Sequence, residues 1–422
     1  MTQSAKRIDG WVHSQITEEE ICLWREHPCN TDGDLRILLF RKPDVVVGEY
    51  PFPEGIATHQ RLVDPFGDRI GLILDRECTY MSKEHWFRPN VMFDSNAIDV
   101  MVQASKAMKG DQLKEVPKWG LVDPIVASRY DLNLDFYVYE TLRTNGVSEA
   151  TLDGLIDPVA RIFEIGNCQR EPWLKERKLV VDLDSVRDVF EAESVRDFKG
   201  LAKAHINLLL GRWKDGMSET FEQWESASYL MLLKTIALSS NSTKPVVKKM
   251  EQLRAFEVET LGVSFMREKL FAALFLEGRY QPARDFILKD LKKSGLRAKL
   301  RGSARDLLLP RFAERFLSAN LAKSKILVPH ILTFDRPLLG LASPIRIHHM
   351  YSRIGESAWS IVYDFEHLKK QFAKPISLDV INALASTPRM AVSSHRNISG
   401  VEIKEIMDVL EKQVANWLCV NL

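Results

Sequence analysis

The sequence predicts an α/β protein with a central parallel sheet and flanking helices. Two short, mainly apolar runs, at residues 91–93 and 326–334, each end at an aspartate that is followed by a turn or helix signal. A strand that ends in a polar residue and leads into a helix is the unit from which parallel sheets are built. Residues 150–300 carry apolar side chains at spacings of three and four, with few Pro or Gly, which predicts a long helical region.

The pattern changes along the chain and divides it into four regions. Residues 1–88 contain short apolar runs broken by Pro- and Gly-rich turns, which predicts a small N-terminal β-rich module. Residues 89–149 hold the first part of the α/β domain, and residues 150–300 form a helical insertion. Residues 301–422 complete the α/β domain and end in C-terminal helices.

Composition limits the class of protein. The chain has 422 residues, of which 45% are hydrophobic and 27% charged, as in ordinary globular proteins. Its five cysteines include no CxxC pair, which favours a reducing compartment over a zinc cluster. No signal-peptide pattern and no apolar stretch of about 18 to 20 residues is visible, so we expect a cytoplasmic protein that makes no membrane contact. No GxxxxGK[ST] motif is present, which argues against ATP hydrolysis.

A basic segment stands out against a formal net charge of +1. Residues 284–325 contain twelve Lys or Arg and four acids. Such a density of positive charge is typical of a surface that binds a phosphate backbone, so nucleic acid is the expected partner. A solvated helix face would give the same pattern. The candidate contacts are Lys292, Lys293, Arg297, Lys299, Arg301, Arg305 and Arg311.

The two strand-end aspartates, Asp94 and Asp335, suggest a cation site. In open α/β sheets, catalytic groups gather beyond the carboxyl ends of the strands. Two carboxylates there repel each other unless a divalent cation neutralises them. Glu140, on a predicted helix, and either Asp306 or Glu314 would complete an all-oxygen site suited to Mg²⁺ or Mn²⁺.

Three motifs resemble those of the PIN-domain nuclease family. VMFDSNAID looks like the first-strand signature of that family, an apolar run that ends in Asp and continues with Ser or Thr and then Asn. YVYETLR is similar to the helix with the second acid, and HILTFDRPLL looks like the late strand with Thr or Ser two residues before the final Asp. The motifs map onto Asp94, Ser95, Asn96, Glu140, Thr333 and Asp335.

The resemblance implies a PIN-like fold and a metal-dependent nuclease. The acids Asp94, Glu140, Asp306 and Asp335 would hold Mg²⁺ or Mn²⁺ and activate water for attack on a phosphodiester. Ser95, Asn96 and Thr333 would orient these carboxylates. Glu314 has a more usual spacing from the last acid than Asp306, and Pro337 stands where the family commonly has a polar residue. The helical insertion is also larger than the family pattern.

Each motif also has a purely structural interpretation. Asp94 and Asp335 are good helix caps, and Glu140 could be a solvated helix residue. Two other functions therefore stay open. One is a catalytically inactive nucleic-acid-binding or assembly protein. The other is a mainly helical adaptor in which the acids never meet. An active nuclease would need restraint, so we also expect a regulatory protein or a multi-protein complex as partner.

Overall fold

The computed structural model describes most of the chain from Trp86 onward and three earlier strands. The described residues are 35–41, 62–63, 70–74, 86–108, 131–176, 178–181, 196–240, 243–262, 265–289, 291, 295–320, 325–342, 345–353, 360–364, 367–368, 370, 377, 379–380, 384 and 400–419.

The chain folds into two compact units, each assembled from separate stretches of sequence. The first unit comprises residues 1–209, 312–334 and 346–364. The second comprises residues 210–311, 335–345 and 365–422. The first unit thus combines stretches from both halves of the chain.

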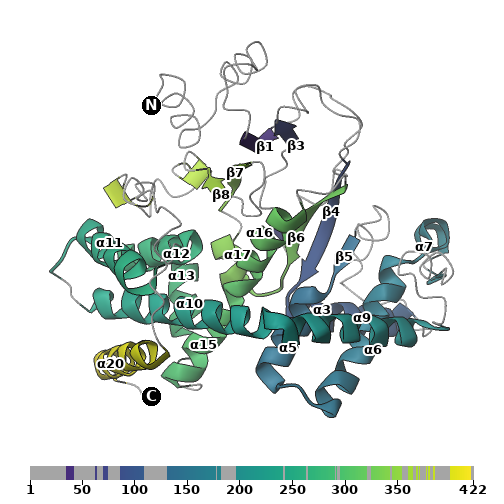
Figure 1. Ribbon diagram of the computed structural model, residues 1–422, viewed down its shortest axis with the longest axis horizontal. Helices are drawn as coiled ribbons and strands as arrows, with labels where there is room; N and C mark the ends of the chain where they lie inside the picture. The colour runs from purple at the N-terminus through teal and green to yellow at the C-terminus, as the bar shows by residue number, and fades with distance from the viewer. Residues whose placement is uncertain are drawn as a thin grey trace, which may run out of the picture. The chain divides into compact units, whose positions relative to one another are not determined.

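A four-stranded sheet with a parallel centre forms the core of the first unit. Its order is β2 (Leu62–Val63), β6 (Lys325–Leu332), β4 (Trp86–Phe93) and β5 (Asp131–Asn133). Strand β4 runs parallel to both β5 and β6, whereas β2 is antiparallel to β6. The three parallel strands lie side by side in Figure 1. The predicted α/β class with a parallel sheet and flanking helices is therefore confirmed.

Strand β4 is central although it contains Pro89, which cannot donate a backbone hydrogen bond. Strand β5 pairs with residues 90–92 of β4, so Pro89 lies beyond that overlap, and among the described strands it pairs with β6 alone. The C-terminal residues of β4, from Val91 to Phe93, are fully buried. Burial on both faces is the rule for a parallel sheet that is covered by helices.

A second, antiparallel sheet combines strands from both ends of the first unit. Its order is β3 (Ile70–Leu74), β1 (Leu35–Arg41), β7 (Ile347–Arg353) and β8 (Ser360–Tyr363). The β-rich character predicted for residues 1–88 is present in β1 and β3. The sheet is nevertheless not confined to that region, because β1 pairs with β7.

The first unit also contains several helices. They are α3 (Ser95–Met108), α5 (Asp135–Asn145), α6 (Glu149–Gly166), α7 (Arg170–Glu176) and the start of α9 (Phe198–Arg212). Helix α5 contacts β4, and α6 contacts β5 and α3. Gly166 at the end of α6 permits this approach, because a Cβ atom there would lie 2.8 Å from Cδ1 of Leu132 in β5.

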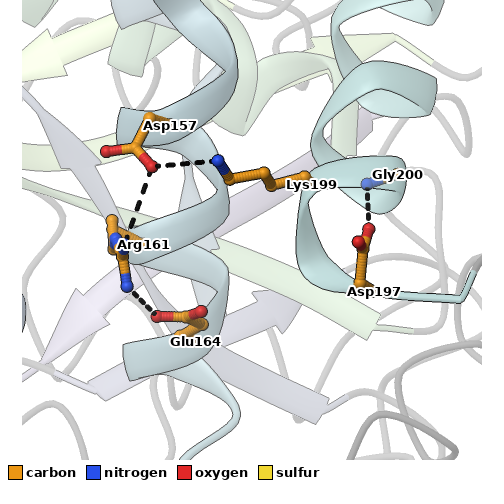
Figure 2. Close-up of polar contacts among 6 residues, drawn as sticks. All are labelled: Asp157, Arg161, Glu164, Asp197, Lys199 and Gly200. Carbon is orange, nitrogen blue, oxygen red and sulfur yellow. Dashed lines mark hydrogen bonds and ion pairs between the residues drawn. The ribbon is translucent and has the colours of Figure 1, made fainter. Parts of the chain in front are cut away.

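Polar contacts hold α9 beside α6 (Figure 2). Lys199 of α9 lies 3.8 Å from Asp157 of α6, and Arg161 bridges Asp157 and Glu164 within α6. The side chain of Asp197 accepts a hydrogen bond of 2.7 Å from the backbone N–H of Gly200 and so caps the first turn of α9. Asp197 therefore caps the helix that carries His205, and one exposed ion pair connects this helix to α6.

The second unit is helical, as the sequence predicted for much of this region. Helix α10 lies at its centre and contacts α11, α12, α15 and α20. A kink with Gly216 at φ 110° separates α9 from α10, a conformation that glycine adopts without strain. The elements here and at the junctions are η2 (Trp213–Met217), α10 (Ser218–Ser239), α11 (Val246–Ala255), η3 (Phe256–Leu261), α12 (Met266–Glu277), α13 (Gln281–Leu288), α15 (Leu296–Asp306), α16 (Leu308–Asn320), α17 (Arg336–Ala342) and α20 (Gly400–Leu418).

None of the described helices is both long enough and apolar enough to cross a membrane.

Candidate acidic site at the carboxyl ends of β4 and β6

Asp94 lies directly after β4 and links this strand to β6. Its side chain is 8% exposed, so water screens it little. Its Oδ2 accepts a hydrogen bond of 2.7 Å from the hydroxyl of Thr333 and one of 2.6 Å from the side-chain amide of Asn96. Thr333 is fully buried. The carboxylate predicted at the first strand end therefore meets two of the three residues predicted to orient it.

Backbone groups also form hydrogen bonds between the ends of β4 and β6. The N–H of Asp94 donates to the carbonyl of Leu332 at 3.1 Å. The side-chain oxygen of Asn96 accepts a hydrogen bond of 2.9 Å from the backbone N–H of Phe334. Asn96 thus binds the carboxylate through its nitrogen and the β6 segment through its oxygen, which fixes the orientation of the amide.

Glu140 is joined to this strand end through Ser95. The hydroxyl of Ser95, the first residue of α3, donates a hydrogen bond to Oε2 of Glu140 in α5. Helix α5 is held in place by its apolar face, in which Phe136 and Tyr139 pack their rings at 5.7 and 6.0 Å from that of Phe312. Ser95 therefore connects the Glu140 carboxylate to the residue that follows Asp94.

Asp99 and Tyr137 also lie near Glu140, and no sequence motif indicated either residue. Burial, then the negative charges of Asp99 and Glu140, raise the pKa of Tyr137 to about 12. The phenol therefore stays protonated at neutral pH. Asp99 follows Ser95 by four residues in α3, and Tyr137 precedes Glu140 by three in α5. These spacings place each pair on one helix face, which is the signal that could have identified them.

The end of β5 adds a further polar group to the same edge of the sheet. The side-chain oxygen of Asn133 accepts a hydrogen bond of 2.9 Å from the backbone N–H of Asp135. The carboxylate of Asp135 lies 3.5 Å from Nε2 of His205, whose ring packs edge-on against Phe163. His205, interpreted from the sequence as a structural histidine, is thus paired with an acid at a strand end. Asp135, at the start of the segment that forms α5, was the sequence feature that could have indicated an acid at this strand end.

The remaining predicted acids occupy other positions. Asp335 belongs to the second unit, where its Oδ1 accepts a hydrogen bond of 2.8 Å from the N–H of Leu338 and caps α17. This is the capping role that the sequence allowed for it. Asp306 is the last residue of α15, also in the second unit. Glu314 lies in the first unit and accepts a hydrogen bond of 3.2 Å from the hydroxyl of Tyr363. A shared ion for all four acids stays a prediction.

The carboxylate oxygens at the strand ends are the kind of ligand that a hard cation such as Mg²⁺ prefers. Among the described residues, no group of three or more His, Cys, Asp or Glu side chains is arranged to hold a metal ion. Mg²⁺, however, is commonly held by one or two carboxylates, with water and substrate phosphates completing its shell. Asp94 and Glu140, bridged through Ser95, offer two carboxylates and no softer nitrogen or sulfur donor.

Four arginines of the basic segment bind glutamates within the second unit. Arg297 pairs with Glu411 at 2.6 Å, Arg301 and Arg305 pair with Glu225 at 3.5 and 3.3 Å, and Arg311 pairs with Glu268. Each glutamate is at most 2% exposed. These glutamates compensate the positive charge of the four arginines, which weakens the positive surface that the sequence predicted for phosphate binding. Lys299 is partly exposed on α15, whereas Lys292 and Lys293 lie outside the described residues.

The chain matches no family model, no curated protein and no solved structure.

Proposed function

We propose that the chain is a metal-dependent nuclease with a PIN-like active site at the carboxyl ends of β4 and β6. The observation that supports this proposal is two groups of hydrogen bonds at neighbouring residues, Asp94 and Ser95, which bring together residues from three distant segments. Thr333 and Asn96 bind the carboxylate of Asp94, and Ser95 binds that of Glu140. These five residues were named from sequence motifs alone, so their convergence supports the chemistry that the motifs imply.

In this proposal, Asp94 and Glu140 hold Mg²⁺ or Mn²⁺. The bound ion would lower the pKa of a coordinated water and stabilise negative charge on the phosphodiester. Thr333 and Asn96 keep the Asp94 carboxylate from rotating, and Ser95 does the same for Glu140. Tyr137, whose pKa is raised to about 12, offers a hydroxyl donor near Glu140 and Asp99.

The test is cleavage of labelled single- and double-stranded DNA and RNA with Mn²⁺ or Mg²⁺, with and without chelator. We expect Asp94→Asn and Glu140→Gln each to lower the cleavage rate more than about 100-fold, because loss of a ligand exceeds the 10- to 100-fold effect of an orienting group. Glu149→Gln removes an exposed charge from the same unit and should cleave like the wild type. Cleavage that persists in Asp94→Asn or under chelation would refute the proposal.

One observation favours the alternative of a catalytically inactive nucleic-acid-binding or assembly protein. Oδ2 of Asp94 already accepts two hydrogen bonds that tie β4 to β6, which is a structural role in its own right. In that case the chain binds nucleic acid without cutting it, and chelation leaves binding unchanged. The same cleavage assay, combined with a binding measurement, separates the two functions.

A further inference from the structure

The three arginines of α15 form one row. Arg297, Arg301 and Arg305 are spaced by four residues, so their side chains emerge from the same face of the helix. This face contacts α10 and the C-terminal helix α20, which lies beside α15 in Figure 1. The row is only partly covered, since the side chains of Arg297, Arg301 and Arg305 are 52%, 36% and 27% exposed.

Two different helices supply the carboxylates that bind this row. Arg301 and Arg305 share Glu225 of α10, the central helix of the unit. Arg297 instead depends on Glu411 of α20, which contacts it at 2.7 Å through Nε and at 2.6 Å through Nη2. Both nitrogens contact the same oxygen, Oε2, and a guanidinium group can bind a phosphate oxygen in its place.

Helix α20 covers the row at further points. Glu411 is 1% exposed and accepts a second hydrogen bond, at 2.5 Å, from the hydroxyl of Tyr229 in α10. Met407, one turn earlier in α20, contacts Arg301 through its sulfur at 3.7 Å. Asp408, three residues before Glu411, adds a second negative charge near Arg297. Helix α20 thus presents carboxylates to arginines that the sequence identified as phosphate contacts.

We infer that α20 is an autoinhibitory element that competes with a nucleic-acid backbone for the arginine row of α15. With α20 docked, Glu411 occupies the guanidinium of Arg297, and the neighbouring helix restricts access to Arg301. A polyanion that binds the row displaces the carboxylates of α20 and takes their place. This inference rests on the proposed nucleic-acid substrate and adds a mechanism that restrains its binding.

The first test compares Glu411→Gln with Glu405→Gln in the full-length protein. Both variants remove one negative charge from α20, but Glu405 is exposed, whereas Glu411 binds Arg297. The probe is a fluorescent single-stranded oligonucleotide of about 20 nucleotides, titrated at several salt concentrations. We expect Glu411→Gln to bind several-fold more tightly than Glu405→Gln, with a salt slope steeper by about 0.7, the value for one extra phosphate contact on a single strand.

Equal affinities and equal salt slopes for the two variants would overturn the inference and leave the proposed nuclease to be judged by metal-dependent cleavage of the wild type. Absence of binding in both variants at low salt would overturn the inference and the nucleic-acid substrate together.

A second test uses the unaltered protein, so it does not depend on how Glu411→Gln folds. Hydrogen exchange of α20 is followed with and without an excess of the oligonucleotide. Faster exchange at residues 400–418 in its presence supports displacement of the helix, because undocked amides lose protection. Unchanged or slower exchange there shows that α20 stays docked and overturns the inference.

Discussion

Replacing Thr333 by valine removes one hydroxyl from the junction of β4 and β6 and nearly preserves the shape of the side chain. Thr333 is fully buried and Asp94 is 8% exposed, so water cannot easily replace the lost donor. Hydrogen bonds to charged groups contribute about 1.5–3 kcal/mol to stability. The expected loss of unfolding free energy is therefore about 1.5–3 kcal/mol, or about 10- to 150-fold in the unfolding equilibrium.

Urea denaturation followed by far-UV circular dichroism measures this loss from the shift of the transition midpoint. Thr141→Val is the matched control, since the Thr141 hydroxyl donates to the carbonyl of Tyr137 within α5, a neutral bond at a half-buried position. A neutral bond contributes only about 0.5–1.5 kcal/mol. If Thr333→Val loses no more stability than Thr141→Val, the Asp94 carboxylate is not held as argued.

Three further predictions concern single side chains. Ser95→Ala should weaken Mn²⁺ binding and cleavage about 10- to 100-fold by releasing Glu140, with an unchanged circular dichroism spectrum; full activity would contradict its orienting role. The pKa of Tyr137 is raised to about 12 in the fold from 10, so its contribution to stability is complete below pH 10 and lost as pH rises to 12. Tyr137→Phe should therefore lose less stability than the wild type as pH rises from 10 toward 12. Urea midpoints at pH 9 and 11.5 measure the two losses. Equal losses would argue against burial of the phenol. Arg311→Met should destabilise the second unit by about 3–5 kcal/mol in thermal denaturation, because it leaves the buried charge of Glu268 without this partner. Glu268→Gln in the same chain should restore part of the loss, and a single variant as stable as the wild type would refute the argument.

The strand ends were predictable because local patterns determine them. An apolar run that stops at Asp94 and continues with Ser and Asn describes a buried strand, a turn and a helix start, and the structure has β4 and α3 there. The same pattern located β6 and the cap at Asp335. Thr333 and Glu140 were placed beside this junction by motif resemblance, since no local pattern specifies contacts between residues so far apart in the chain.

The role of the basic segment was not predictable from charge density. A run of arginines shows that positive charge is present but not where each guanidinium points. Arg297 and Glu411 are 114 residues apart, and Arg311 and Glu268 are 43 apart. The buried glutamates Glu225, Glu268 and Glu411 lie in three different helices, α10, α12 and α20. Only the packing of those helices shows that the carboxylates face inward.

The sequence did not indicate Asp99 and Asp135 as site residues for a different reason. Each lies on a helix close to a more conspicuous residue, and acids at helix starts are usually solvated or favourable to the helix dipole. Their relevance follows from the parallel register of β4 and β5, which aligns the residues after the two strands. That register depends on a three-residue strand, β5, too short for a periodic signal.

The pairing of β1 with β7 and of β4 with β6 has a consequence for synthesis of the chain. Leu35 pairs with Arg353, and Phe93 with Leu332, so both sheets of the first unit need residues that are synthesised long after β1 and β4. Until then, an edge of β4 and an edge of β1 have no native partner strand, and exposed strand edges invite pairing with other chains. A nascent chain arrested before residue 325 therefore carries Asp94 at the end of a strand that lacks its β6 partner, which delays assembly of the acidic site until β6 has been synthesised.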